Sequence, residues 1–248
     1  MVARTVAVAY QNGGVGKTTL AMHIARFLAL LEQRVVLADM DPQANATLGL
    51  GGLTTSAPEA LDPSLEDILE PKAANFYLVP SPGASKVITR TPKVDPTKLD
   101  RVFAGLADSM DWIIVDCPPR IDDWGWAALC LADAILIPVQ PEFFSLQGLA
   151  QAFRVVEQVS KSRGTTLDLL GVVVNMEDQR APIAREVMAD LRGHLGHKVF
   201  QTVVQRDPHY VEAASHGVTV WEHAPTSLAT RMMASLTREV MDGREKAR

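Results

Sequence analysis

The sequence predicts an α/β fold in which helices cover both faces of a mostly parallel, twisted β-sheet. Short apolar runs alternate with longer segments of helical periodicity, as in repeated βαβ units. The short runs are rich in valine, isoleucine and leucine, which is typical of strands that are buried on both faces. Because the chain has 248 residues, of which 47% are hydrophobic, we expect residues 1–248 to form a single domain.

The expected strands are the short apolar runs, and the expected helices are the longer amphipathic segments between them. Strands are predicted at residues 5–10, 34–39, 76–79, 112–116, 134–139, 169–175 and 199–203. Helices are predicted at residues 17–32, 96–110, 123–131, 146–161, 182–194 and 227–241.

The segment from residue 49 to residue 95 interrupts this alternation. It is richer in glycine, proline, serine and threonine than its surroundings. Ser64 and Asp67 have the spacing of a capping box, which predicts the start of a short helix. We interpret this segment as an insertion between core strands and not as a second domain.

The charge, the cysteines and the terminal segments exclude several classes of protein. A formal net charge of -5 argues against coating of nucleic acid by overall charge, so any DNA contact requires a local patch. The two cysteines, Cys117 and Cys130, indicate neither a disulfide framework nor a metal cluster, and we expect core thiols. Neither terminal segment has the pattern of a signal peptide or membrane anchor. We therefore expect a cytoplasmic protein without a membrane partner.

A glycine-rich segment directly after the first predicted strand has the composition of a phosphate-binding loop. Its glycines allow main-chain N–H groups to turn toward phosphate oxygens, and the following helix N-terminus adds the positive end of its dipole. Lys17 can then bind the β- and γ-phosphates, and the hydroxyl of Thr18 can bind Mg²⁺. An ordinary glycine-rich turn is the alternative, which the GKTT run between strand and helix disfavours. The candidate nucleotide-binding residues of the loop are Gly13, Gly14, Val15, Gly16, Lys17, Thr18 and Thr19.

Aspartates follow or end two of the predicted strands at the edge of the sheet where ligands bind in α/β proteins. Asp41, two residues after Asp39, is a candidate for orienting the attacking water and for binding Mg²⁺. The alternative is that Asp41 only caps the turn before Pro42. Asp116 is the candidate acid that holds Mg²⁺ directly or through water, with a turn cap as its alternative.

Five motifs in the same order resemble those of the ParA/Soj partition ATPases. They are QNGGVGKTT (residues 11–19), DMDPQANAT (39–47), IIVDCPP (113–119), ILIPVQPEFFSLQGL (135–149) and EAASHGVTVWEHAPTS (212–227). Gln11 stands where a generic phosphate loop has its first glycine, whereas the Gly13 and Gly14 pair matches the deviant Walker A form. The resemblance implies a P-loop NTPase fold of the deviant Walker A type, ATP or ADP with Mg²⁺ as cofactors, and a role for Asp41 in hydrolysis.

Asn175 closes a predicted strand and resembles the adenine-contacting asparagine of the family. A buried asparagine that hydrogen bonds to a loop backbone would give the same pattern. Residues 175–178 are superficially similar to the guanine-reading NKxD motif, but Met176 replaces the lysine, which favours ATP. Arg206 is a further candidate ligand of the nucleotide.

Two positions depart from the family pattern. Most relatives carry a lysine at position 12, which the family places on the phosphates of the partner in a nucleotide-sandwich dimer. Asn12 can form only weaker, neutral hydrogen bonds to phosphate, so we expect slow hydrolysis or weak ATP-driven dimerisation. Asn12 is nevertheless a candidate catalytic residue.

The second departure is Arg120, which replaces a small polar residue. We hypothesise that it supplies part of the missing charge in cis or in trans. The alternative is a surface pairing of Arg120 with Asp122 or Asp123.

The family binds double-stranded DNA without sequence preference as an ATP-bound homodimer, and a ParB-type partner stimulates hydrolysis. DNA binding requires clustered cations, whereas composition alone would place most basic residues on solvated helix faces. The candidates in this chain are Arg180, Arg185, Arg192, Lys198, Arg206, Arg231 and Arg238. The resemblance thus implies a nucleoid-associated switch for chromosome or plasmid partition. The alternatives are a related ATPase that positions a non-DNA cargo and a hydrolysis-defective, ADP-bound scaffold.

Overall fold

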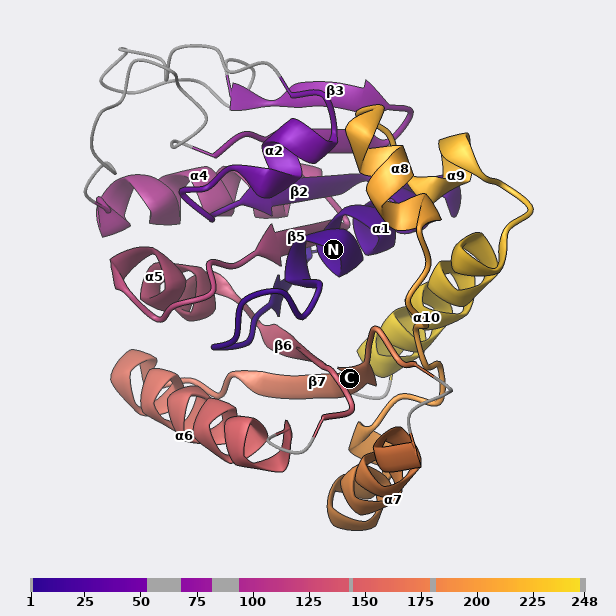
Figure 1. Cartoon of the computed structure of the whole chain (residues 1–248). Helices are drawn as coiled ribbons and strands as arrows, with labels where there is room; N and C mark the ends of the chain where they lie inside the picture. Colours follow the sequence, from indigo (N-terminus) through magenta and orange to yellow (C-terminus); the bar gives the residue numbers. More distant parts are fainter. Residues whose placement is uncertain (1, 53–67, 82–93, 143–144, 179–181, 246–248) are drawn as a thin grey trace.

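The computed structural model contains a seven-stranded β-sheet with the strand order β3-β4-β2-β5-β1-β6-β7 (Figure 1). It describes residues 2–52, 68–81, 94–142, 145–178 and 182–245. Neighbouring strands pair in parallel, except that β3 pairs with β4 in the antiparallel direction. The predicted α/β fold with a mostly parallel sheet is therefore confirmed.

The bounds of the elements agree with most of the predicted ranges. The strands are β1 (Arg4–Val8), β2 (Val35–Asp39), β3 (Glu70–Ala73), β4 (Phe76–Val79), β5 (Trp112–Asp116), β6 (Ala134–Val139) and β7 (Asp168–Val174). The longer helices are α1 (Lys17–Leu30), α4 (Pro96–Ser109), α5 (Asp123–Leu131), α6 (Ser145–Arg163), α7 (Pro182–Leu195) and α10 (Leu228–Glu245). The shorter ones are α2 (Asn45–Gly49), α8 (His209–Ser215), α9 (Val220–His223) and the 3-10 helix η2 (Gly196–Lys198).

One predicted strand is absent from the described structure, and one predicted helix cannot be compared with it. The strand predicted at residues 199–203 is wrong, because within this segment only the isolated bridge between Val172 and Val199 is formed. The short helix predicted to begin at Ser64, with Asp67, lies outside the described residues.

Both faces of the sheet are covered by helices, which explains the continuous apolar strands. Along β1, Val6 and Val8 face the side of α1 and α10, whereas Ala7 faces the side of α4, α5 and α6. Figure 1 shows these two groups of helices on opposite sides of the sheet. On α1, Leu20, Ile24 and Leu28 follow the helical spacing and are buried, and each such side chain contributes about 1.5–3 kcal/mol. No helix in the described ranges combines the length and apolarity needed to cross a membrane.

Candidate functional site

The glycine-rich loop connects the carboxyl end of β1 to the first residue of α1. Gly14 and Gly16 have left-handed backbone angles, with φ values of 76° and 87°, which glycine adopts without strain. Position 16 also has no room for a side chain, because a Cβ atom there would lie 2.2 Å from Nδ2 of Asn175. These two constraints fix the path by which the loop enters α1.

Lys17 is buried at the start of α1, and its side chain folds back into the loop. Its Nζ atom donates a hydrogen bond to the main-chain oxygen of Asn12 at 2.7 Å, and the residue is only 7% exposed. Burial lowers the pKa of Lys17, whereas nearby acidic groups, chiefly Asp116, raise it. The loop therefore encloses an ammonium group close to the sheet edge where the aspartates lie.

Two side-chain amides from neighbouring strand ends hold the loop. Nδ2 of Asn175 donates to the main-chain oxygen of Val15 at 2.7 Å, and Nε2 of Gln140 donates to that of Gly14 at 3.3 Å. One of the two readings of Asn175, a hydrogen bond to a loop backbone, is thus present in the fold, while its contact with adenine stays a prediction. Gln140 was not among the predicted site residues, although its position directly after a predicted strand could have identified it.

Asp39 organises the chain that follows β2. It lies opposite Asp116 in the register of β2 and β5, and the two residues are 1% and 0% exposed, respectively. Its carboxylate accepts hydrogen bonds from the main-chain N–H of Asp41 and from the N–H and hydroxyl of Thr47, at 2.7–3.1 Å. Burial raises the pKa of Asp39 to about 6, and these hydrogen bonds oppose that rise. Asp39 therefore fixes the turn that carries Asp41, a role shared with Thr47 that the sequence did not reveal.

Asp41 has both a structural and a site-facing position. Its Oδ1 atom accepts a hydrogen bond from the main-chain N–H of Gln43 at 2.9 Å, so it does cap the turn at Pro42. The same residue lines two adjoining cavities at the carboxyl edge of the sheet. Capping therefore fixes the side chain beside the cavity and leaves the proposed hydrolytic role compatible with the geometry.

Asp116 carries a buried carboxylate that the protein does not satisfy by itself. Neither of its oxygens has a hydrogen-bond partner of standard geometry among the described residues. Burial and the neighbouring Asp39 charge raise the pKa of Asp116, whereas the nearby Thr18 hydroxyl and Lys17 favour the ionised form. Within the described ranges no three acidic, histidine or cysteine side chains could hold a metal ion together. One carboxylate and one hydroxyl nevertheless fit Mg²⁺, which typically keeps several waters and binds substrate phosphates as well.

The loop, Lys17 and Asp41 meet around a cavity of about 480 Å³. It is lined by Gly13, Gly14, Gly16, Lys17, Thr18, Thr19, Met22, Asp41, Gln43, Asn45, Pro119, Met176 and Ala214. The structure thus brings most of the predicted phosphate-binding residues together. A second cavity of about 720 Å³ shares Asp41, Gln43 and Pro119 with the first, and it is also lined by Arg120.

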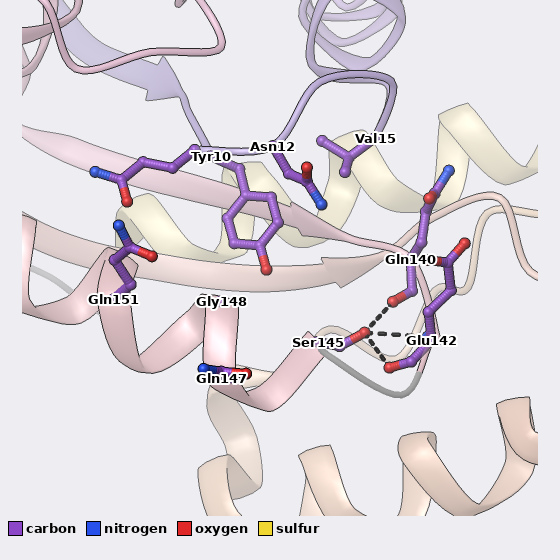
Figure 2. A pocket seen from close by; sticks show the side chains of 10 residues that line it. Tyr10, Asn12, Val15, Gln140, Glu142, Ser145, Gln147, Gly148 and Gln151 are labelled. Carbon is purple, nitrogen blue, oxygen red and sulfur yellow. Dashed lines mark hydrogen bonds between the residues drawn. The ribbon is translucent and has the colours of Figure 1, made fainter.

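Asn12 is exposed and lines a different cavity of about 280 Å³ behind the loop (Figure 2). This cavity is polar, with Tyr10, Gln140 and Glu142 among its lining residues. Ser145, at the start of α6, shapes its rim by donating to the main-chain oxygens of Gln140 and Glu142 (Figure 2). Asn12 therefore lines a cavity other than the one that Lys17 lines, and its catalytic role stays a prediction.

The basic residues predicted to bind DNA do not share one element. Arg180 lies outside the described residues. Four arginines are exposed and form no ion pair within the described part of the chain. They are Arg185 and Arg192 on α7, and Arg231 and Arg238 on α10.

Lys198 and Arg206 lie outside α7 and α10. Nζ of Lys198 donates to the main-chain oxygen of Leu169 at 2.9 Å, near the amino end of β7 and thus at the opposite edge from the phosphate loop. The ammonium group of Lys198 is therefore already hydrogen bonded within the fold. Arg206 is exposed, and its main-chain N–H donates to the oxygen of Glu177 close to Met176, which lines the nucleotide cavity.

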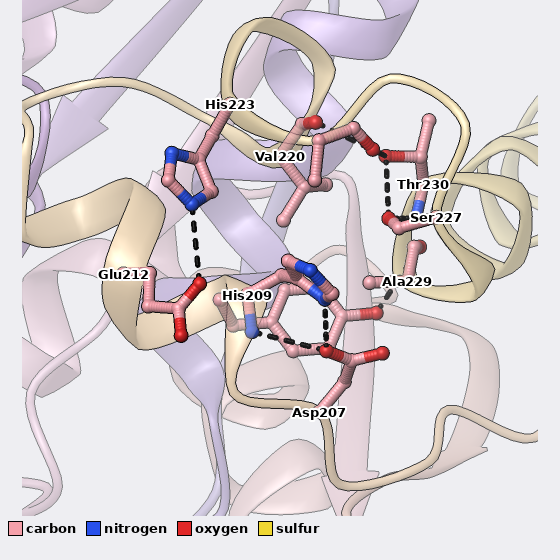
Figure 3. Close-up of polar contacts among 10 residues, drawn as sticks. Asp207, His209, Glu212, Val220, His223, Ser227, Ala229 and Thr230 are labelled. Carbon is pink, nitrogen blue, oxygen red and sulfur yellow. Dashed lines mark hydrogen bonds and ion pairs between the residues drawn. The ribbon is translucent and has the colours of Figure 1, made fainter.

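The segment of α8 and α9 completes one wall of the site, since Ala214 of α8 lines the nucleotide cavity. Polar contacts hold it in place: Glu212 lies 3.2 Å from Nε2 of His223, and Thr230 donates to the main-chain oxygen of Val220 (Figure 3). The main-chain N–H of Val220 in turn donates to Nε2 of His23 at 3.1 Å. This packing ties the C-terminal motif to the helix that begins at the phosphate loop.

Comparison with known proteins gives a consistent result. Residues 3–169 match the profile of a family described as an AAA domain. The chain is 38% identical over 240 residues to the chromosome-partitioning ATPase Soj of Thermus thermophilus, covering 96% of this chain and 95% of that protein. It is 34% identical to the chromosome partitioning protein ParA of Myxococcus xanthus, covering 97% and 88%, respectively. The septum site-determining protein MinD of Pyrococcus horikoshii, complexed with Mg-ADP, has the same fold, with a TM-score of 0.78, 24% identity and 96% coverage of both chains.

Proposed function

The chain belongs to the Soj/ParA family, and from this membership we propose that it is an ATP-dependent switch for the partition of chromosomal or plasmid DNA. It binds ATP or ADP with Mg²⁺ and hydrolyses ATP to ADP and phosphate. In the proposed cycle the ATP-bound protein dimerises and binds DNA without sequence preference, and a ParB-like partner stimulates hydrolysis. We further propose that residues 1–248 act as one nucleotide-binding domain in the cytoplasm.

The observation that carries this proposal is the meeting of the phosphate loop, Lys17 and Asp41 around one cavity at the carboxyl edge of the sheet. The buried carboxylate of Asp116 lies close enough to Lys17 to raise its pKa. In this geometry the loop N–H groups and Lys17 bind the phosphates, and Thr18 and Asp116 hold Mg²⁺. The ion supplies positive charge that stabilises the transferring phosphoryl group. Asp41, fixed by its turn, orients the attacking water.

The DNA-binding part of the proposal is supported by the four exposed arginines on α7 and α10, which have no ion-pair partner in the described ranges. Free guanidinium groups can bind phosphates and release counterions from DNA. Lys198 contributes less, because its ammonium already donates to the fold. We expect binding of random duplex to need ATP and to weaken steeply as salt is raised.

Calorimetry and phosphate release with Mg²⁺ and adenine nucleotides test this function. We expect ATP and ADP uptake, slow turnover, and loss of both in a folded Lys17→Ala protein. Lys161→Ala is the matched control, because Lys161 is exposed on α6 and forms an ion pair with Glu157, away from the phosphate loop. Absence of nucleotide uptake by the wild type, or equal uptake by Lys17→Ala, contradicts the proposal.

The same preparations distinguish the alternatives. Nucleotide-independent DNA binding contradicts the switch. Turnover without any DNA binding favours an ATPase that positions a non-DNA cargo. Nucleotide binding without turnover, even with a candidate ParB-like partner, favours a hydrolysis-defective scaffold.

A further inference from the structure

Arg120 is a free cation beside the nucleotide cavity. It is exposed and lines the cavity of about 720 Å³ that shares Asp41, Gln43 and Pro119 with the nucleotide cavity. In the described structure its guanidinium forms no ion pair or hydrogen bond. Asp122 and Asp123 line the same cavity, yet neither holds it.

One of the two acidic side chains close to Arg120 in the sequence is used to cap a helix. Oδ1 of Asp122 accepts hydrogen bonds from the main-chain N–H groups of Trp124 and Gly125, both at 3.1 Å, so this carboxylate caps α5. The cap places the Asp122 carboxylate at the N-terminus of α5, where the helix dipole stabilises its negative charge. The sequence-based alternative, a surface pairing of Arg120 with Asp122 or Asp123, is therefore not adopted.

The backbone of Arg120 is fixed although its side chain is free. A Cβ atom at position 125 would lie 2.3 Å from the main-chain oxygen of Arg120, so only glycine permits α5 to approach this closely. Pro118 and Pro119 precede Arg120 and restrict the chain further. A long cationic side chain thus extends from a fixed point at the mouth of the site.

The nucleotide cavity has few basic groups to balance the negative charge of a bound triphosphate. Asp39, Asp41 and Asp116 lie at the sheet edge, whereas Lys17 is the only basic residue among those that line the nucleotide cavity within the described ranges. Asn12 is neutral and lines another cavity. ATP carries one more phosphate group than ADP, and an arginine binds phosphate through charge-assisted hydrogen bonds.

We propose that Arg120 binds the terminal phosphate of ATP in its own protomer and supplies in cis the positive charge that Asn12 lacks. This inference rests on the proposed function. It makes Arg120 a residue that distinguishes ATP from ADP, because its ligand is present only in the triphosphate.

Binding of ADP and of a non-hydrolysable ATP analogue with Mg²⁺ tests the inference, at a protein concentration where sedimentation shows only monomer. We expect Arg120→Ala to weaken binding of the ATP analogue by about ten-fold or more, with ADP binding changed by less than about two-fold. Arg120→Lys should restore part of the loss, since it keeps the charge without the planar fork. Arg154→Ala, which removes an exposed arginine from α6, should leave both affinities unchanged.

Several results would overturn this inference. Equal weakening of ADP and ATP-analogue binding, or no weakening of either, contradicts it. A loss confined to concentrations at which the protein dimerises contradicts the cis placement. If the wild type binds neither nucleotide, the proposed function itself fails, which is distinguishable from the failure of Arg120 alone.

Discussion

Asn175 donates its side-chain amide to the main-chain oxygen of Val15 at 2.7 Å, and this contact ties the end of β7 to the phosphate loop. Asn175 is 3% exposed and Val15 is 1% exposed, so water does not readily replace the hydrogen bond. Asn175→Ala leaves a buried carbonyl unpaired, and we expect the free energy of unfolding to fall by about 1–3 kcal/mol. Urea denaturation of the nucleotide-free protein measures this change. Asn175→Asp should be at least as destabilising, because it places a carboxylate oxygen against the carbonyl.

The glycines of the loop should differ sharply in their tolerance of alanine. Gly16→Ala combines a φ of 87° with a Cβ atom 2.2 Å from Asn175, and we expect a loss of stability greater than about 1 kcal/mol. Gly13→Ala meets no atom within 4 Å and should change the stability by less than about 0.5 kcal/mol. Thermal unfolding without nucleotide compares the two variants. Equal effects would show that the close approach at Gly16 does not hold in solution.

His23 should make the stability of the fold dependent on pH. Its Nε2 atom accepts a hydrogen bond from the N–H of Val220, while Nδ1 lies 2.6 Å from the oxygen of Thr19. Burial lowers the pKa of His23 from 6.5 to about 4. Between these values the unfolded chain binds more protons than the folded one, so stability falls as the pH is lowered from 6.5 toward 4. The full difference amounts to about 3 kcal/mol.

Unfolding free energies measured across this pH window test the prediction. His23→Gln should be less stable at pH 7 but should have a flatter pH dependence than the wild type. His194→Gln is the control, because His194 is exposed on α7, and its slope should match the wild type. Asp39, with a raised pKa, acts with the opposite sign, so the comparison must be the difference between His23→Gln and wild type. An identical slope in the two proteins would refute the assignment.

The fold could be predicted from the sequence where burial on both faces makes the strands continuously apolar. The central strands are apolar on both faces, and six of the predicted strands match β1, β2, β4, β5, β6 and β7 within two residues at each end. β3 was not predicted because its sequence, EPKA, has no apolar run. It is an edge strand that pairs in the antiparallel direction with β4. The segment at 199–203 has a strand-like sequence, but Phe200 packs tightly over Gly171 and the chain pairs with β7 and its extension only at isolated bridges.

The candidate site could be predicted in part, for a similar physical reason. We could predict the loop glycines, Lys17 and Asp116 because they come at or directly after strand ends and because phosphate and Mg²⁺ binding requires such residues. Local sequence spacing does not determine which residue a side chain contacts across the fold. Thus Lys198 has the sequence of a DNA-binding cation but donates to Leu169. Arg120 has acidic neighbours in the sequence but forms no ion pair with any residue that the structure describes.

Asp41→Asn separates the two roles that the structure gives to this residue. The amide oxygen of asparagine can still accept the hydrogen bond from Gln43, so the turn and the nucleotide affinity should be retained. The charge that orients the attacking water is removed, and we expect hydrolysis to slow by about 100-fold or more. Asp122→Asn is the matched control, since it changes an acid of the adjoining cavity and also keeps its capping oxygen. Phosphate release that is equal in Asp41→Asn and wild type would leave Asp41 with only its turn, whereas a loss of nucleotide binding would show that its charge matters before the chemical step.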